Sequence, residues 1–125
     1  MKKLAAILCG AAPGMTVEQL ISIYGQPVSR NGDDLIFSDF RVEIDDNRPN
    51  VVESIETRSG AIATPDGVKI GQDAGILNRV YGQADKVDAE WNETDYEYFS
   101  DNYSQKIEFT VKNGVIVKIK CRLWD

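Results

Sequence analysis

The residue types that usually carry out catalysis are sparse in this 125-residue sequence. It contains no histidine, so the acid/base, nucleophile-activating and metal-binding roles of imidazole are closed to it. Carboxylates are the remaining candidates, and they occur in three groups: Asp33-Asp34, Asp45-Asp46, and Asp85 with Asp88 and Glu90. No loop has the alternating Asp pattern of a calcium site, and no carboxylate pair is tied to a pocket. We therefore predict a non-enzymatic protein without a metal or another cofactor.

Two sets of side chains are candidates for binding. The aromatic set suits a protein partner, because such side chains bury a large area and keep a polar handle, although Tyr96 and Tyr98 also suit a core. Its members are Trp91, Tyr96, Tyr98, Tyr103 and Trp124. The basic set suits an anion or an acidic partner, or it pairs across strands with Glu108 and acidic loops. Its members are Lys106, Lys112, Lys118, Lys120 and Arg122.

Two cysteines, Cys9 and Cys121, lie near opposite ends of the chain, and their spacing matches no zinc or redox motif. One interpretation is that both are small buried apolar residues. The other is a disulfide between the N-terminus and the last strand. It requires an oxidising compartment and Cα atoms within about 7 Å of each other.

A repeated stretch indicates how these side chains are positioned. The segments GMTVEQLISIYGQP (residues 14–27) and GQDAGILNRVYGQA (residues 71–84) lie 57 residues apart and are identical at five positions without a gap. Unrelated segments of this length share about one residue at ordinary amino-acid usage. We interpret the match as an internal duplication, with repeats at about 14–66 and 67–125.

Each copy contains a predicted short helix. Thr16 and Gln19 form a capping box, and apolar residues at helical spacing lead to Gly25 as the C-terminal glycine. In the second copy Asp73 is the predicted N-cap, Gly75 weakens the helix by about 1 kcal/mol, and Gly82 ends it. Helices of two turns are not stable alone, so each must pack on other structure.

That structure is predicted to be an antiparallel sheet. Residues 35–37, 40–44 and 51–57 follow the first helix, and residues 96–98, 107–111 and 115–123 follow the second, with alternating or short apolar patterns. Asn113-Gly114 is a strong hairpin signal. Residues 85–93 are predicted to form an acidic connection. The expected fold is α+β, a single domain over residues 1–125, built of two tandem α-β-β-β repeats with both helices on one face.

The order of these motifs resembles the tandem repeat of the β-lactamase inhibitor protein group and the small outer-membrane lipoproteins of SmpA/OmlA type. The residues that carry the resemblance are Gly14-Met15-Thr16, Tyr24-Gly25-Gln26-Pro27, Gly67-Val68-Lys69-Ile70-Gly71 and Tyr81-Gly82-Gln83. The resemblance implies an exported, non-catalytic protein that binds another protein. The alternative function is a small-ligand or anion-binding domain that uses the basic set.

Location and partner class follow from the N-terminus and the charge. Residues 1–13 contain Lys2, Lys3 and a short apolar stretch, which fits either a signal-like segment or a first strand or helix of the domain. The envelope or the exterior is therefore one expected location and the cytoplasm the other. The stretch is too short to span a bilayer, so no transmembrane segment is predicted. The net charge of −6 argues against non-specific binding of nucleic acid.

Overall fold

The computed structural model of the protein describes residues 11–100 and 104–123, which form two short helices and one antiparallel sheet of eight strands. The helices are α1 (Val17–Tyr24) and α2 (Gly75–Tyr81). The strands are β1 (Ser29–Asn31), β2 (Asp34–Ile36), β3 (Arg41–Ile44), β4 (Val52–Thr57), β5 (Lys86–Ala89), β6 (Thr94–Phe99), β7 (Gln105–Lys112) and β8 (Val115–Leu123). The predicted α+β fold with a mainly antiparallel sheet is confirmed.

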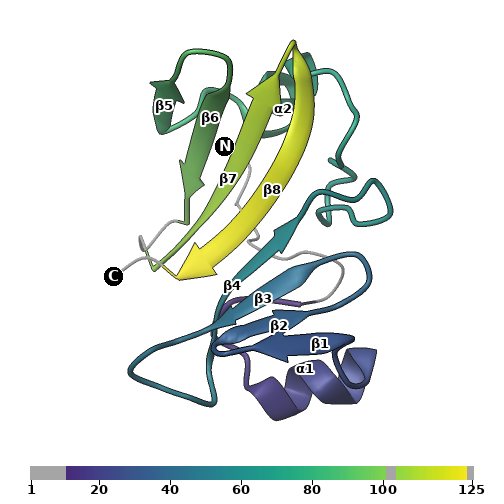
Figure 1. The fold of residues 1–125 in the computed structure, drawn as a ribbon. Helices are drawn as coiled ribbons and strands as arrows, with labels where there is room; N and C mark the ends of the chain where they lie inside the picture. The colour runs from purple at the N-terminus through teal and green to yellow at the C-terminus, as the bar shows by residue number, and fades with distance from the viewer. Residues whose placement is uncertain (1–10, 101–103, 124–125) are drawn as a thin grey trace.

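The strand order places two meanders side by side. It is β1-β2-β3-β4-β8-β7-β6-β5, so the meander after each helix contributes four strands, and the two meet where β4 pairs with β8 (Figure 1). At this junction Glu56 lies opposite Lys120, between the pairs Ile55–Cys121 and Thr57–Ile119. We call α1 with β1–β4 the N-terminal half and α2 with β5–β8 the C-terminal half. The edge strands of the sheet are β1 and β5.

The first helix begins and ends as the sequence predicts. The Thr16 hydroxyl accepts a hydrogen bond from the Gln19 N–H at 3.1 Å, and the Gln19 side chain accepts one from the Thr16 N–H at 2.9 Å. Gly25 follows the helix with φ of 78°, and its N–H donates to the Ile21 carbonyl at 2.7 Å. Both ends of α1 therefore have partners for groups that helix ends leave unpaired.

The second helix ends in the same way but begins differently. Gly82 has φ of 81°, and its N–H donates to the Asn78 carbonyl at 3.0 Å. At the start, Ala74 and not Asp73 occupies the N-cap position and makes no side-chain cap bond. The Asp73 carboxylate instead accepts the N–H of Gly75 at 2.9 Å. The predicted capping residue is therefore displaced by one position, although its carboxylate still accepts a backbone N–H at the helix start.

The segment before each helix pairs with the start of a strand. The Gly14 N–H donates to the Val52 carbonyl at 2.8 Å, and the Val52 N–H donates to the carbonyl after Gly14 at 2.9 Å. The Gly71 N–H donates to the Ile116 carbonyl at 2.9 Å, and the Ile116 N–H donates to the carbonyl after Gly71 at 3.0 Å. The φ angles of Gly14 and Gly71 are 95° and 96°, in a region that favours glycine.

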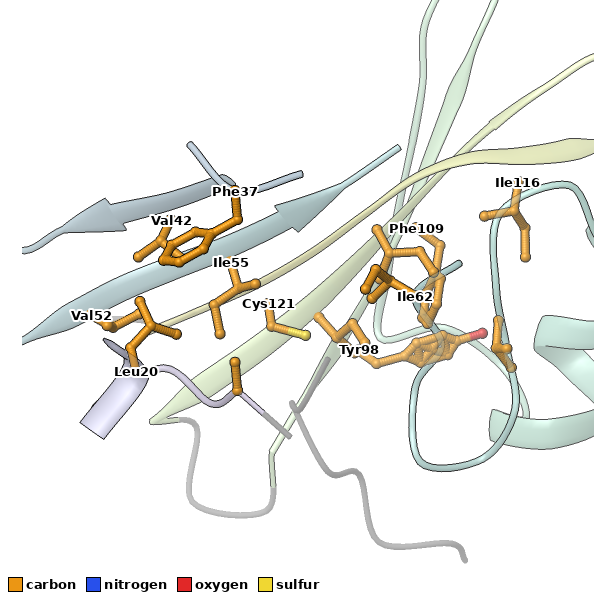
Figure 2. Close-up of a cluster of buried hydrophobic side chains, with 14 of the residues drawn as sticks. Leu20, Phe37, Val42, Val52, Ile55, Ile62, Tyr98, Phe109, Ile116 and Cys121 are labelled. Carbon is orange, nitrogen blue, oxygen red and sulfur yellow. The ribbon is translucent and has the colours of Figure 1, made fainter. Parts of the chain in front are cut away.

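The hydrophobic core lies on one face of the sheet. Six buried side chains form a continuous row of direct cross-strand neighbours on that face: Leu35, Val42, Ile55, Cys121, Ile107 and Tyr98. Leu20 of α1 and Leu77 of α2 belong to the same buried cluster, so both helices cover this face as predicted. Figure 2 shows Leu20 beside Val52 near one end of the drawn cluster, with Tyr98 and Ile62 toward the other.

The number of strands differs from the prediction. The sequence predicts three strands after each helix, whereas the structure has four. The additional strands are β1 and β5, whose residues are all exposed. β1 contains no apolar residue, and the alternation in β5 covers only four residues. Residues 61–70 form turns with one bridge between Ala63 and Lys69.

The N-terminal segment is described only in part. Residues 1–10 lie outside the described chain, and Ala11 is buried in the core. None of the helices in the described residues combines the length and apolar character needed to cross a bilayer.

Candidate binding site at the β5–β6 edge

The hairpin of β5 and β6 forms one edge of the sheet and carries two exposed apolar side chains. The strands pair from Lys86 opposite Glu97 to Ala89 opposite Thr94, and residues 90–93 connect them. Trp91 in this connection is 94% exposed, and Val87 in β5 is 54% exposed. Burying a tryptophan removes about 150–250 Å² from water, so a hairpin that leaves both a tryptophan and a valine in water marks a candidate contact site.

A hollow of about 320 Å³ lies between α2 and this hairpin. Its apolar lining includes Leu77, Val87 and Tyr96, and Val87 lies directly opposite Tyr96 in the sheet. Tyr98 also lines it and is buried, and its hydroxyl donates to the Gly82 carbonyl at 3.0 Å. Burial raises the pKa of Tyr98, so the phenol stays protonated as this donor. The hollow can therefore accept an apolar side chain without leaving this hydroxyl unpaired.

Small residues on the α2 side create the hollow. Ala74, Gly75 and Ala84 line it and contribute little side-chain volume. At Gly75, an added Cβ would lie 2.8 Å from the Asp73 carboxylate and 3.2 Å from the Arg79 guanidinium. Glycine thus leaves room for the Asp73 carboxylate to reach the N–H of Gly75. In exchange, glycine destabilises the helix by about 1 kcal/mol relative to alanine.

Carboxylates lie next to the exposed apolar residues in the sequence of the hairpin. Four exposed acidic residues lie on or next to the hairpin: Asp85, Asp88, Glu90 and Glu93. Asp85 accepts the Phe99 N–H at 2.8 Å. Lys86 is the one basic residue of β5, and its ammonium lies 3.9 Å from the Glu97 carboxylate. The edge is therefore negatively charged around an apolar centre.

The structure divides the predicted aromatic set. Trp91 and Tyr96 both belong to the β5–β6 hairpin, where Tyr96 lines the hollow and Trp91 is exposed in the connection. Tyr98 is only 5% exposed and forms ring contacts with Tyr81 and Phe109, which agrees with the core position that the sequence also allowed for it. Tyr103 and Trp124 lie outside the described residues.

The basic set lies on the sheet face opposite the core, but acidic residues are interleaved with it. Lys106 donates to Glu97 at 2.7 Å and lies 3.1 Å from Glu108. Burial lowers the pKa of Lys106, but hydrogen bonds to Glu97 and Glu108 outweigh this effect, and the net pKa is raised. Lys120 lies between Glu56 and Glu108 in the sheet.

The remaining members of the basic set do not form a continuous patch of positive charge. Lys118 lies opposite Thr110, and Lys112 opposite Val115 beside the β7–β8 turn. Arg122 lies opposite Lys106, and its Nε is buried without a hydrogen-bond partner in the described chain. Since Lys106 and Lys120 have acidic neighbours, the structure shows mixed charge on this face, which agrees with the cross-strand pairing that the sequence offered as the other interpretation of the basic set.

The acidic groups contain two carboxylates whose pKa values shift in opposite directions. Asp45 accepts hydrogen bonds from the Arg48 side chain and from the Asn47 N–H, and these contacts lower its pKa. Asp46 shares a hydrogen bond with Asp33, and this contact raises the pKa of Asp46. In residues 11–100 and 104–123, no group of three or more potential metal ligands comes together.

Cys121 occupies the centre of the core. Its thiol is free and buried, and this burial raises its pKa, which is expected of an unreactive structural thiol. Cys9 lies outside the described residues, so the disulfide that the sequence offered as the second interpretation of the two cysteines is not tested.

Two further hollows have a different character. One, of about 370 Å³, lies at the β2–β3 turn beside Phe40 and Arg58, and the other, of about 110 Å³, lies on the charged face between Arg41 and Lys120. Neither is lined by one of the exposed large apolar side chains, whereas Val87 lines the hollow at β5. Of these three hollows in the described residues, the one at the β5–β6 edge combines a concave apolar surface with an exposed apolar side chain.

The sequence matches no family model and no curated protein. The fold is similar to that of a DUF4309 family protein (YjgB) from Bacillus subtilis, with a TM-score of 0.62 and 12% identity over 87% of this chain and 78% of that one. It is also similar to an extracellular protein containing an SCP domain from Bacillus anthracis. That match has a TM-score of 0.60 and 9% identity over 98% of this chain and 47% of the other. Identities this low show a shared fold alone.

Sequence reasoning misses several residues of this site. Val87 lies within the predicted acidic connection, although Lys86-Val87-Asp88-Ala89 does alternate between charged and apolar residues. That alternation is the available signal for an edge strand. The hollow has no comparable signal, because small residues such as Gly75 and Ala84 indicate missing volume only once their neighbours in space are known.

Proposed function

We propose that this protein is a non-catalytic module that binds a protein partner through the β5–β6 edge. The observation that carries the proposal is the 94% exposure of Trp91 on a hairpin that also lines an apolar hollow of about 320 Å³. Tryptophan is among the residues that contribute most to protein interfaces, and such anchors act best beside pockets. The missing histidine supports a role without catalysis.

We also propose that the two halves are copies of one unit, as the 57-residue offset predicts. The equivalent glycines Gly14 and Gly71 make equivalent bonds to the starts of β4 and β8. The pairing at the junction is symmetric about Glu56 and Lys120. Ile55 of β4 comes one residue before Glu56, and Ile119 of β8 comes one residue before Lys120. The resemblance to the β-lactamase inhibitor protein and outer-membrane lipoprotein group agrees with such a repeat.

A location outside the cytoplasm is part of the proposal. One similar structure belongs to a protein described as extracellular, and this supports the same location here. The partner would then be a protein of the cell envelope or the medium.

In the experiment, the wild-type chain, Trp91→Ala and Val28→Ser are each immobilised and exposed to envelope and medium fractions of the source organism. The proteins that each of them retains are then compared. Val28 is 73% exposed near β1, at the opposite edge, and it serves as the matched control. We expect a partner that wild type and Val28→Ser retain equally and that Trp91→Ala retains at least about tenfold less, as for loss of an interface anchor. Its affinity is then measured with purified proteins by calorimetry.

Two results would contradict the proposal. Equal retention of the partner by wild type and Trp91→Ala would remove the β5–β6 edge as the contact surface. If wild type retains no protein above the level of a matrix that carries no chain, the binding-module function itself is wrong. Circular dichroism of each variant checks that the fold is intact, which we expect because Trp91 contributes nothing to the buried core.

A further inference from the structure

We infer that the partner binds by strand addition: an extended, positively charged segment pairs with β5 and places an apolar side chain in the hollow beside Tyr96. This inference rests on the proposed function and specifies how that site recognises its partner. The occupant is a segment of another protein in which apolar and basic residues alternate.

The backbone of β5 supports this mode of binding. β5 is an edge strand in the sheet order, and all four of its residues are exposed. An edge strand leaves one row of N–H and C=O groups unpaired, and an extended peptide can add to that row. β5 contains no proline, so each of its residues has an N–H group.

The register of β5 determines which side chains of the added strand meet which surface. Side chains alternate between the two faces of a strand. Val87 and Ala89 point to the same face as Tyr96 and the hollow, because Val87 lies opposite Tyr96. Residues of the added strand opposite these two positions therefore need to be apolar.

The other face of β5 selects for positive charge. Lys86 and Asp88 lie on this face, and Glu90 follows β5 in the connection, so residues of the added strand opposite Asp88 and Glu90 meet carboxylates. Asp85 and Glu93 add to the negative field, against the single ammonium of Lys86. Such a field favours association with a cationic segment and weakens with salt.

Trp91 can extend the contact beyond the backbone of the added strand. It lies in the connection that follows β5, and nearly all of its side chain is exposed. An indole next to a basic segment offers a cation–π contact as well as apolar area. The three requirements give one recognition pattern: apolar, basic, apolar, basic in extended conformation.

The test uses a designed peptide of sequence acetyl-Thr-Val-Arg-Val-Arg-Thr-amide and the full-length protein. Calorimetry measures affinity, and amide NMR of the labelled protein locates the contact. We expect shifts and slowed hydrogen exchange at residues 86–89. N-methylation of the peptide amides that face β5 should abolish binding, whereas methylation of the alternate set should be tolerated, because only one set pairs with an adjacent strand.

Three variants separate the contributions. Asp88→Asn with Glu90→Gln should weaken the peptide about tenfold at low salt, since two charges are removed. Asn78→Ile should weaken it about tenfold by placing a larger side chain at the lining of the hollow. Val28→Ser, at the opposite edge, should leave the affinity unchanged and serves as the control.

Four results would overturn the inference. Equal tolerance of both N-methylated peptides would show side-chain docking without strand pairing. Equal affinity for the peptide with glutamate in place of arginine would remove the charge requirement. Sedimentation that shows self-association through β5 would make a second copy the occupant. Absent peptide binding, together with Trp91-dependent retention of a native partner, would reject strand addition and leave the proposed function intact.

Discussion

The N-terminal and C-terminal halves use similar backbone bonds around their helices, but they differ in the side chains beside those helices. α1 presents Val17 and Ile21, both half-buried, where the equivalent positions before Tyr-Gly-Gln in α2 are Ala74 and Asn78. Ala74 and Asn78 line the hollow at the β5–β6 edge. The hollow thus lies beside the helix with the smaller side chains at these two positions.

The aromatic residues follow the same division. In the N-terminal half Phe37 and Phe40 stack with centroids 4.6 Å apart, and Tyr24 packs edge-on against Phe40 at 5.0 Å. In the C-terminal half Tyr81 and Tyr98 lie in the core, while Tyr96 lines the hollow and Trp91 is exposed. We therefore expect the C-terminal half to provide the contact surface and the α1 side to be the more tightly packed.

The largest loss of stability is expected when the equivalent leucines of the two helices are truncated, in Leu20→Ala and Leu77→Ala. Leu20 is fully buried, so its loss should cost about 3–5 kcal/mol in free energy of unfolding. Leu77 is 3% exposed and lines the hollow, so its loss should cost about 2 kcal/mol, because less packing is lost there. Urea unfolding curves measure both values. Equal losses would mean that the two helices are packed equally well.

The second test concerns Gly75 and uses a double-mutant cycle with Asp73. An exposed glycine in a helix usually gains about 1 kcal/mol when it is replaced by alanine. Here the new Cβ would lie 2.8 Å from the Asp73 carboxylate, so Gly75→Ala should leave the unfolding free energy almost unchanged. In an Asp73→Ala background the same change should stabilise by about 0.5–1 kcal/mol.

A full gain for Gly75→Ala in the wild-type background would contradict this account. It would mean that the Asp73 carboxylate moves away freely and does not hold the start of α2. Thermal unfolding of the four proteins of the cycle decides between the two outcomes. The variants with alanine at position 75 also report whether the hollow tolerates an added methyl group.

Much of the fold follows from local patterns in the sequence. The capping box of Thr16 and the glycines after each helix are local signals, and the structure contains both. Alternating residues predict β3, β6, β7 and β8, because a half-buried strand imposes period two on its sequence. Asn113 is the described non-glycine residue with positive φ, at 54°, as its Asn-Gly turn predicts.

The parts that escape prediction depend on neighbours in space. β1 buries no residue, so its sequence has no apolar alternation. A two-residue turn joins Asn31 to Asp34, and Asn31-Gly32 is itself a hairpin signal, but without that alternation the signal does not predict a strand. The alternation in β5 is only four residues long. The sequence leaves Tyr98 open between surface and core for a related reason, since nothing local distinguishes a core tyrosine from an exposed one.

The third test concerns the connections between paired strands in the two halves, and it should change the melting temperature least. In the N-terminal half Asp45 holds the connection between β3 and β4. In the C-terminal half the connection between β7 and β8 is the Asn113-Gly114 turn. Hydrogen bonds from Arg48 and Asn47 hold the pKa of Asp45 below its usual value. A carboxylate with a lowered pKa stabilises the folded state above its unfolded pKa of about 4, and this contribution is lost as pH falls through the folded pKa. Asp45→Asn should therefore lower the melting temperature at pH 7, and the difference from wild type should fade in acid.

Asp46 provides the control, because its pKa is shifted in the other direction by Asp33. Its ionised form is less favourable in the folded protein than in the unfolded chain, so Asp46→Asn should leave the melting temperature at pH 7 unchanged or raise it. At neutral pH, Asp45→Asn should thus lower the melting temperature whereas Asp46→Asn should not, and both variants should converge with wild type as the carboxylates become protonated. Melting curves from pH 7 to pH 3 measure both. If Asp45→Asn and Asp46→Asn behave alike at neutral pH, the hydrogen bonds of Asp45 do not stabilise this connection, and its length alone distinguishes it from the Asn113-Gly114 turn.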